Sequence, residues 1–452
     1  MRNVKNSSLI DQGTENAQRI DSRSGGQWES WNGLIVHRYS RMYVPRSEHE
    51  LRQVVADAQQ VRVLGNGQSS ADIAAGSDTL VSLEAYADVV TVDTEHMRIE
   101  VQAGMTLKSL MCRIEAKGWT LDCLPDIDTV TVGGAIATGT HGTAGGAQPL
   151  HGYVVGMRLI RADGSVDVLD EDSEEMPATR CALGLLGVVS TLTFQCKPIT
   201  RLRVEEGPVP DDVWLSRFRT WLDTYSFVRV QWLPHTGHAF VSLGAPEDMS
   251  TDNFEGHHSF PWDSHQVPGR SPWYVAHRQE VSRFLYRLSA RFPRFTALAN
   301  RIIFLLFFRH RVRKTGSLYG ATVTKKRNST LELAEWTVDM DSFPSLFRRM
   351  KRRFADPRNA AYAHIPMDIR FLSEDDTWLS NAYGRDTVTV GCVTRNPEHA
   401  HRYQAFDMVE DLFLEYGGRP HWAKRYKLTH DTLSALYPKW RDFMHLRAEA
   451  DP

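Results

Sequence analysis

The sequence has few cysteines, no apolar leader and almost no net charge, and each shortage excludes a class of protein. Five cysteines occur among 452 residues. None lies in a CxxC pair. Reduced, mostly buried thiols are therefore expected, and neither a disulfide framework nor a metal site is expected. The first twenty residues are polar and lack the apolar core of a secretory signal, which favours a cytoplasmic protein. A net charge of −2 attracts neither nucleic acid nor membranes overall, so no nucleic-acid partner is expected.

Two common nucleotide-binding signatures are also missing. The strand-like residues 61–64 run into Gly65, Asn66 and Gly67, a loop that brings backbone N–H groups close to whatever lies beside it. A Rossmann fingerprint would need a glycine at Ser70 and a helix directly afterwards, and the following residues are too small and broken for a helix. A P-loop would need Gly-Lys-Ser or Gly-Lys-Thr, which the loop lacks. Taken alone, the loop fits a tight turn as well as a phosphate site.

Stretches of small residues, in which little side chain covers the backbone, recur at two later places in the sequence. Residues 124–146 are mostly Gly, Thr and Ala, and a third small-residue stretch follows at 184–189. Because ordered elements flank the long run, a backbone buried against a ligand is favoured over a linker. Three such segments suit a long phosphate-bearing ligand that main-chain N–H groups hold, and FAD fits this description.

Patterning predicts an α+β protein of two parts. Ser47 and Glu50 form a capping box for a helix over 47–60. A second helix is expected over 106–119, and a hairpin over 153–170. In the second part, strands are expected over 226–243, 364–372 and 386–394. Helices are expected over 343–354 and 401–416.

Changes in composition suggest the domain limits. Residues 1–25 are predicted to be a flexible tail, and 26–200 a first domain rich in small residues. Residues 201–409, where Trp, Phe and Arg become frequent, are predicted to form a second domain. Residues 410–452 form a C-terminal segment.

An apolar run within residues 291–316 has two interpretations. Seven large apolar residues, 302–308, stand between arginines, and they are too few to span a bilayer. A buried helix of the second domain is favoured. A helix that docks on a membrane surface or a partner is the alternative.

Several motifs together resemble one enzyme family. They are "WESWNG", "VRVLGNGQSSADIA", "DIDTVTVGGAIATGTHGTAGG", "LGLLGVVSTLTF", "MDIRFLSEDDTWLSNAYGRDT" and "RPHWAK". In order and spacing they resemble the vanillyl-alcohol-oxidase superfamily, whose FAD-binding domain is of the PCMH type. Within it they resemble the branch of sugar-lactone oxidases (gulono-, galactono- and arabinonolactone) and alditol oxidases. The resemblance implies a two-subdomain FAD-binding domain, completed by residues 410–452, and an α+β substrate or cap domain.

The same resemblance implies an activity. It is FAD-dependent oxidation of an alcohol or lactol carbon, by hydride transfer to flavin N5. The substrate would be a sugar-lactone-like, alditol-like or other hydroxylated small molecule, and the electron acceptor O2 or another carrier. The alternative is a flavin-binding relative with a specialised biosynthetic substrate or without alcohol oxidation.

The resemblance also implies which residues hold the cofactor. The pyrophosphate would lie on Leu64, Gly65, Asn66, Gly67, Gln68 and Ser69. The flavin and phosphates would pass Val132, Gly133, Gly134, Ala137, Thr138, Gly139, His141 and Gly142, and the adenosine end Gly187, Val188 and Val189. Many relatives have a histidine, bonded to the flavin, where this chain has Gln68. A carboxamide cannot form that bond, so a non-covalent FAD is predicted.

Four residues are the predicted catalytic group. Arg370 and Lys424 would stabilise negative charge on the reduced flavin. Asp368 shares a strand face with Arg370, although relatives often have glutamate there, which reaches further. A surface ion pair is the alternative for these two. His421 would orient the substrate or act as a base, or else pack as a core histidine beside Trp422.

Overall fold

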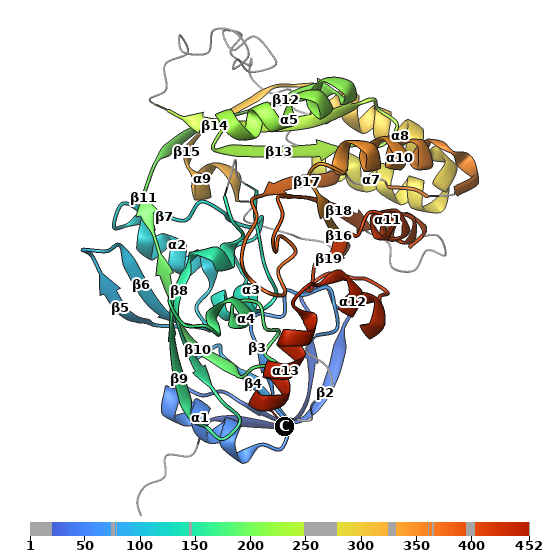
Figure 1. Ribbon diagram of the computed structural model, residues 1–452. Coiled ribbons are helices and arrows are strands. Elements are labelled where there is room, and N and C mark those ends of the chain that lie inside the picture. Colours follow the sequence, from blue (N-terminus) through green and yellow to red (C-terminus); the bar gives the residue numbers. More distant parts are fainter. Residues whose placement is uncertain are drawn as a thin grey trace, which may run out of the picture.

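Two main sheets form the N-terminal part of this computed structural model, in the lower half of Figure 1. The structure describes residues 20–73, 77, 79–143, 147–247, 278–323, 331–359, 361–363, 366–394 and 403–451. The first sheet has the order β1 (Ser22–Glu29), β2 (Val36–Tyr43), β4 (Thr79–Ser82) and β3 (Arg62–Leu64). The second has the order β5 (Val89–Asp93), β6 (Arg98–Gln102), β10 (Val188–Gln195), β8 (Val154–Ile160) and β9 (Val166–Asp170). A small pair joins β11 (Lys197–Pro198) to β7 (Trp119–Thr120).

The start of the first sheet bears on the predicted tail. Strand β1 begins at Ser22, within the segment 1–25 that was assigned to the tail, and it pairs with β2. Residues 1–19 of that segment lie outside the described residues.

The two predicted helices of this part form within the ranges 47–60 and 106–119 but end three and four residues before those ranges do. Helix α1 (Glu48–Asp57) starts at Ser47, whose hydroxyl accepts the N–H of Glu50 at 3.2 Å. Helix α2 (Leu107–Glu115) stops before Gly118, and its apolar face is buried. The predicted hairpin is β8 and β9. A short helix, α4 (Met176–Thr179), precedes β10.

Helix α3 (Val132–Ala137) was not predicted, and it lies inside the Gly/Thr run. Thr131 caps it by accepting the N–H of Gly134 at 3.3 Å. A Cβ on Gly133 would lie 2.8 Å from the Cβ of Ala103, directly after β6. Small residues therefore let the helix backbone approach the second sheet, which explains why the run contains so few large side chains.

One antiparallel sheet of eight strands dominates the C-terminal part, in the upper half of Figure 1. Its order is β15 (Val312–Ser317), β12 (Arg201–Pro210), β14 (His238–Pro246), β13 (Phe227–Trp232), β17 (Met367–Leu372), β18 (Thr387–Thr394), β16 (Glu332–Asp339) and β19 (Arg419–Pro420). Helices α5 (Asp211–Thr224), α10 (Phe343–Ala355) and α11 (Gln404–Leu414) pack on it through aromatic side chains. The strands and helices predicted after residue 201 are confirmed. We call this part the cap.

The apolar run within 291–316 is neither wholly buried nor wholly exposed. After α7 (Arg278–Arg291) it forms α8 (Thr296–Ile303) and a π-helical turn (Phe304–Phe308). Ile303 and Phe307 are buried, whereas Leu298 and Leu305 are half exposed. Among the described residues, no helix is long and apolar enough to cross a membrane.

The C-terminal segment leaves the cap after β19, which pairs with β16. Trp422, Tyr437 and Phe443 are buried in the main core of the N-terminal part, so the chain returns there. Helices α12 (His430–Leu436) and α13 (Trp440–Ala450) follow, drawn in red in Figure 1. The crossing point is Pro420 rather than residue 410, because α11 and β19 both belong to the cap.

Candidate active site

A cavity of about 450 Å³ runs from the first sheet to the edge of the cap. Its N-terminal walls are the glycine loop, the end of α3 and the segment before β10. The predicted residues that line it are Leu64, Gly65, Asn66, Gly67, Gln68, Ser69, Gly133, Gly134, Ala137, Thr138, His141, Gly187, Val188 and Val189. The three bare-backbone segments therefore come together, as the sequence predicts. A volume within the 300–1,000 Å³ range of ligand pockets suits a cofactor of this kind.

Three of the predicted cofactor residues do not line the cavity and lie behind the residues that do. Val132 is fully buried in the core. A Cβ on Gly139 would lie 3.2 Å from the sulfur of Cys181, and one on Gly142 would lie 2.1 Å from the carbonyl oxygen of Leu124. These residues support the wall rather than face the cavity.

The glycine loop fits a ligand held by main-chain groups. A Cβ on Gly65 would lie 2.1 Å from the hydroxyl of Thr131, so no side chain fits between the loop and α3. Gly67 has a φ of 60°, which glycine adopts without strain. Gln68 lines the cavity, and its side-chain amide donates to the carbonyl of Asn66 at 3.3 Å.

The same loop holds the C-terminal segment. The carbonyl of Ala423 accepts the N–H groups of Ser70 at 2.8 Å and Ala71 at 3.3 Å. These bonds place His421 and Lys424 on the cavity wall. Two motifs more than 350 residues apart in the sequence are thus joined at one site.

Four charged side chains form a largely buried network at the cap end of the cavity. Arg370 donates to Asp368 at 2.7 Å and to Asp126 at 2.6 Å. Arg229, on β13, donates to Asp368 at 2.6 Å and to Asp126 at 2.9 Å. Arg370 is only 9% exposed, which excludes a surface ion pair. Arg370 and Asp126 line the cavity, whereas Asp368 lies behind them.

The network explains why this chain can have an aspartate at position 368, where relatives often have the longer glutamate. Both carboxylate oxygens of Asp368 accept hydrogen bonds from the two arginines, and these bonds restrict the position of the Arg370 side chain. Burial alone would lower the pKa of Arg370, but Asp126 and Asp368 outweigh it and raise that pKa above its ordinary value. The guanidinium is therefore a permanent cation at the cavity wall.

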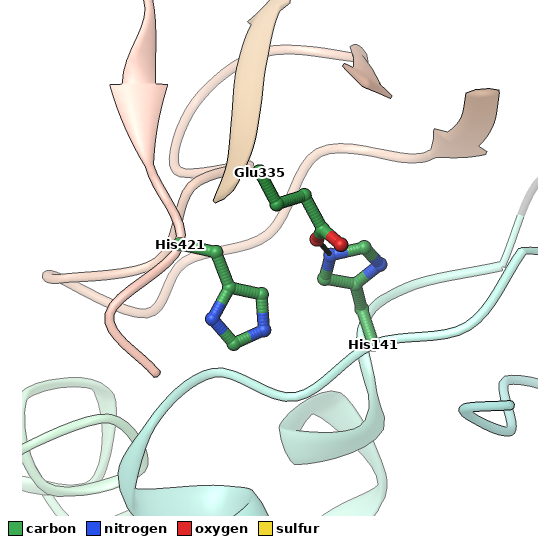
Figure 2. Close-up of side chains that lie close together, drawn as sticks. All are labelled: His141, Glu335 and His421. Carbon is green, nitrogen blue, oxygen red and sulfur yellow. Dashed lines mark hydrogen bonds and ion pairs between the residues drawn. The ribbon is translucent and has the colours of Figure 1, made fainter. Parts of the chain in front are cut away.

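Two histidines and a glutamate meet next to this network (Figure 2). The Nε2 of His141 lies 2.5 Å from an oxygen of Glu335, a residue of β16. The rings of His141 and His421 are 5.4 Å apart between centroids. His421 is thus buried and lines the cavity, whereas the ring of Trp422 stacks on that of Tyr437.

His421 is neutral at ordinary pH. Burial lowers the pKa of His421 from 6.5 to about 3, although Glu335 acts in the opposite direction. Its Nδ1 accepts the N–H of Ala423 at 3.1 Å, so the single proton of the neutral ring is on Nε2. In this state His421 is a hydrogen-bond donor toward the cavity and can orient a substrate oxygen.

Several residues of this site are not evident from the sequence. Glu335, Asp126 and Arg229 were not predicted, and neither was the contribution to the cavity wall of Arg447 and Ala450 on α13. Gly391 is the residue nearest the site, and a Cβ there would lie 3.6 Å from Glu335. Cys392 belongs to the cap core, and all five cysteines are free, as predicted.

Comparison with known proteins places the chain in a family. Residues 192–452, more than half of the chain, match the family model of D-arabinono-1,4-lactone oxidase. The chain belongs to this family. Residues 40–170 match the model of a FAD-binding domain. The chain is therefore a FAD-dependent oxidoreductase, as the resemblance implies.

Relatives of this family member match it over nearly their whole length. L-gulonolactone oxidase of Scyliorhinus torazame is 28% identical over 98% of this chain and 97% of its own. L-gulono-1,4-lactone dehydrogenase of Mycobacterium tuberculosis is 28% identical over 94% of this chain and 96% of its own. The fold is that of cholesterol oxidase from B. sterolicum, with a TM-score of 0.74 at 12% identity, over 98% of this chain and 97% of that one. The predicted fold class is confirmed.

Proposed function

We propose that this protein oxidises a hydroxylated sugar 1,4-lactone at an alcohol carbon, with FAD bound non-covalently. One observation carries the proposal. The cavity is continuous from the glycine-walled half to a half lined by Arg370, Asp126, His421 and Lys424. The first half suits a dinucleotide and the second a small molecule with several oxygens. The relatives named as lactone oxidases and lactone dehydrogenases support the choice of substrate class.

The side chains of the second half have distinct roles in the proposed reaction. When bound, FAD would accept the hydride that leaves the alcohol carbon while the hydroxyl group loses its proton, and the two losses together give the carbonyl product. Arg370 offers a fixed donor, and Asp126 beside it an acceptor, so together they bind neighbouring oxygens of a polyhydroxylated ring. His421 donates from Nε2, which orients a further oxygen. Lys424 adds positive charge, which stabilises negative charge that develops during the reaction.

Reduction of the flavin without oxygen tests this function. The purified protein should be mixed anaerobically with L-gulono-, L-galactono- and D-arabinono-1,4-lactone, and with alditols. We expect at least one lactone to bleach the flavin absorption faster than any alditol. FAD-loaded protein that no lactone reduces would favour the alternative, a relative that binds flavin without oxidising alcohols.

The electron acceptor can be identified in the same anaerobic experiment. Relatives include both an oxidase and a dehydrogenase, so the acceptor is O2 or another carrier. Mixing the reduced protein with air-saturated buffer, and then with an artificial dye, distinguishes the two.

Gln68 leads to a prediction about how the cofactor is attached. Because a carboxamide has no nucleophilic nitrogen, the FAD should leave the protein on acid precipitation. We expect yellow flavin in the supernatant and no fluorescent protein band on a denaturing gel. A Gln68→Ala variant is the matched control and should release its flavin equally. Flavin that stays with the precipitate would refute non-covalent binding.

A further inference from the structure

Glu335 lines the cavity, and the proposed function gives it no role. It lies in the middle of β16, is 6% exposed, and shares the wall with Arg370, His421 and Lys424. Its backbone carbonyl accepts the N–H of His421 at 3.0 Å, which fixes the strand and the C-terminal segment to each other at this point. Glu335 therefore belongs to the half of the cavity that is proposed to hold the substrate.

The sheet of the cap leaves space beside this carboxylate. In the register of the sheet, Glu335 lies opposite Gly391 on β18, and Gly391 lies opposite Asp368 on β17. Residues that lie opposite one another on neighbouring strands present their side chains on the same face, so two carboxylates flank a glycine. A Cβ on Gly391 would lie 3.6 Å from Oε2 of Glu335 and 3.7 Å from the Cβ of Asp368. The missing side chain therefore leaves Oε2 uncovered on this side.

The two oxygens of Glu335 have different surroundings. Oε1 lies 2.5 Å from Nε2 of His141, and this hydrogen bond fixes the direction of the carboxyl group (Figure 2). Within the part of the chain that the structure describes, no donor hydrogen-bonds to Oε2. Asp368, in the same row of the sheet, has no such spare oxygen, because both of its oxygens accept from arginines. A buried carboxyl oxygen without a donor is costly unless a ligand or water supplies one.

The chemistry of this oxygen suits an acceptor rather than a base. Oε2 accepts hydrogen bonds whether the proton between Oε1 and His141 lies on the ring or on the carboxyl group, because in both cases Oε2 carries none. Burial would raise the pKa of Glu335, but His141, His421 and Arg370 outweigh it and hold that pKa well below its ordinary value. A general base works best with a pKa near the pH of the reaction, so Glu335 is poorly suited to remove the hydroxyl proton.

We propose that Oε2 of Glu335 accepts a hydrogen bond from a substrate hydroxyl group other than the one that is oxidised, which makes Glu335 a specificity-determining residue for polyhydroxylated lactones. The inference rests on the function proposed above. A molecule without that hydroxyl would leave a buried oxygen without a donor, and sites of this kind reject such analogues. His141 has the role of a positioning residue, since it holds the carboxyl group through Oε1.

Substrates that lack single hydroxyl groups test the proposal. The probes are L-gulono-, L-galactono- or D-arabinono-1,4-lactone, whichever reduces the flavin fastest, and its derivatives that each lack one hydroxyl group that is not oxidised. Anaerobic single-turnover reduction gives the rate constant of reduction and the Kd for each. Glu335→Gln keeps an oxygen for His141 and places an NH2 group where Oε2 was. For one derivative, the wild type should lose about 10- to 100-fold in the ratio of these constants relative to the parent lactone, and Glu335→Gln should lose nothing further. The other derivatives should lose equal factors in both proteins.

Two further variants make the test decisive. Glu332→Gln removes a carboxylate of the same strand that pairs with Arg425, outside the cavity, and should leave the discrimination among the derivatives as in the wild type. Gly391→Val keeps the carboxyl group and its bond to His141 but adds a branched side chain beside Oε2. It should reduce the discrimination against the same derivative. This second variant decides the question even if Glu335→Gln does not fold.

Each negative outcome has a separate meaning. If Glu335→Gln slows reduction by the parent lactone and by every derivative by one common factor, Glu335 has only a structural role and the inference is overturned. A wild type that reacts equally well with all derivatives would overturn it too, because no hydroxyl group would then be recognised. FAD-loaded wild type that no lactone reduces would instead contradict the proposed function, and the inference with it.

Discussion

Replacing Arg370 by alanine is expected to lower kcat/KM for a sugar lactone by ~10²–10³-fold. The variant removes a donor fixed at the cavity wall, and it leaves Asp126 and Asp368 to share Arg229. A misplaced carboxylate would then face the substrate. Steady-state kinetics, corrected for flavin content by absorbance, measure the loss. FAD should remain bound, because the glycine half of the cavity is unchanged.

Two controls separate a catalytic from a structural effect of Arg370. Arg370→Lys keeps the charge but loses the planar donor pair, so its kcat/KM should lie between wild type and Arg370→Ala. Arg158→Ala removes an arginine that donates to Glu48 at 2.8 and 2.7 Å, away from the cavity. It should lower the thermal midpoint and leave kcat/KM unchanged. Equal losses in Arg158→Ala and Arg370→Ala would refute a direct role in substrate binding.

Gly65→Ala is expected to weaken FAD binding about ten- to hundredfold, from an overpacking cost of about 1–3 kcal/mol. The added Cβ would lie 2.1 Å from the hydroxyl of Thr131 and 3.2 Å from its Cβ. Because Thr131 caps α3, either the loop or the helix must move, and both line the cofactor half of the cavity. Titration of apoprotein with FAD, followed by quenching of the flavin fluorescence, measures the affinity.

Gly320→Ala is the matched control for this substitution. Its Cβ would also approach a hydroxyl, that of Ser317, but at 3.3 Å and outside the cavity. FAD affinity should equal that of the wild type. Circular dichroism and the thermal midpoint should be recorded for both variants, since a Gly65→Ala protein that is unfolded would not test the loop. Undiminished affinity in folded Gly65→Ala would contradict the role given to Gly65.

The cofactor half of the site was more predictable from sequence than the substrate half. The glycine loop and the run before β8 carry a local signal, because a backbone that approaches a ligand excludes large side chains. Asp126 and Arg229 carry no such signal. They come from a loop and a central strand, and only the pairing of β13 with β17 brings Arg229 to Asp368.

Glu335 carries no comparable signal in the sequence. Its strand β16 reads ELAEWTVD, and these letters do not show that seven of the eight residues are buried. Only the fold reveals that this carboxylate is buried and so needs a partner that compensates its charge. That partner, His141, is almost 200 residues away.

Helix α3 was missed for a related reason. Its two glycines have a low helix propensity, so the local sequence does not predict a helix. In the structure, Thr131 caps the helix and burial against Ala103 stabilises it. Tertiary packing decides the conformation of this segment, so the prediction failed where the chain is most constrained by its neighbours.

The walls of the cavity have a consequence for synthesis on the ribosome. They extend from Trp28 to Asp451, so the earliest and latest parts of the described chain close the same space. A nascent chain that has completed the glycine loop still lacks His421, Lys424 and α13. Vectorial folding can thus form the N-terminal sheets early, but cofactor capture must wait until residues 421–451 have emerged. During that interval the unfilled apolar walls are exposed to chaperones and proteases, so riboflavin supply should affect the yield of this protein in cells.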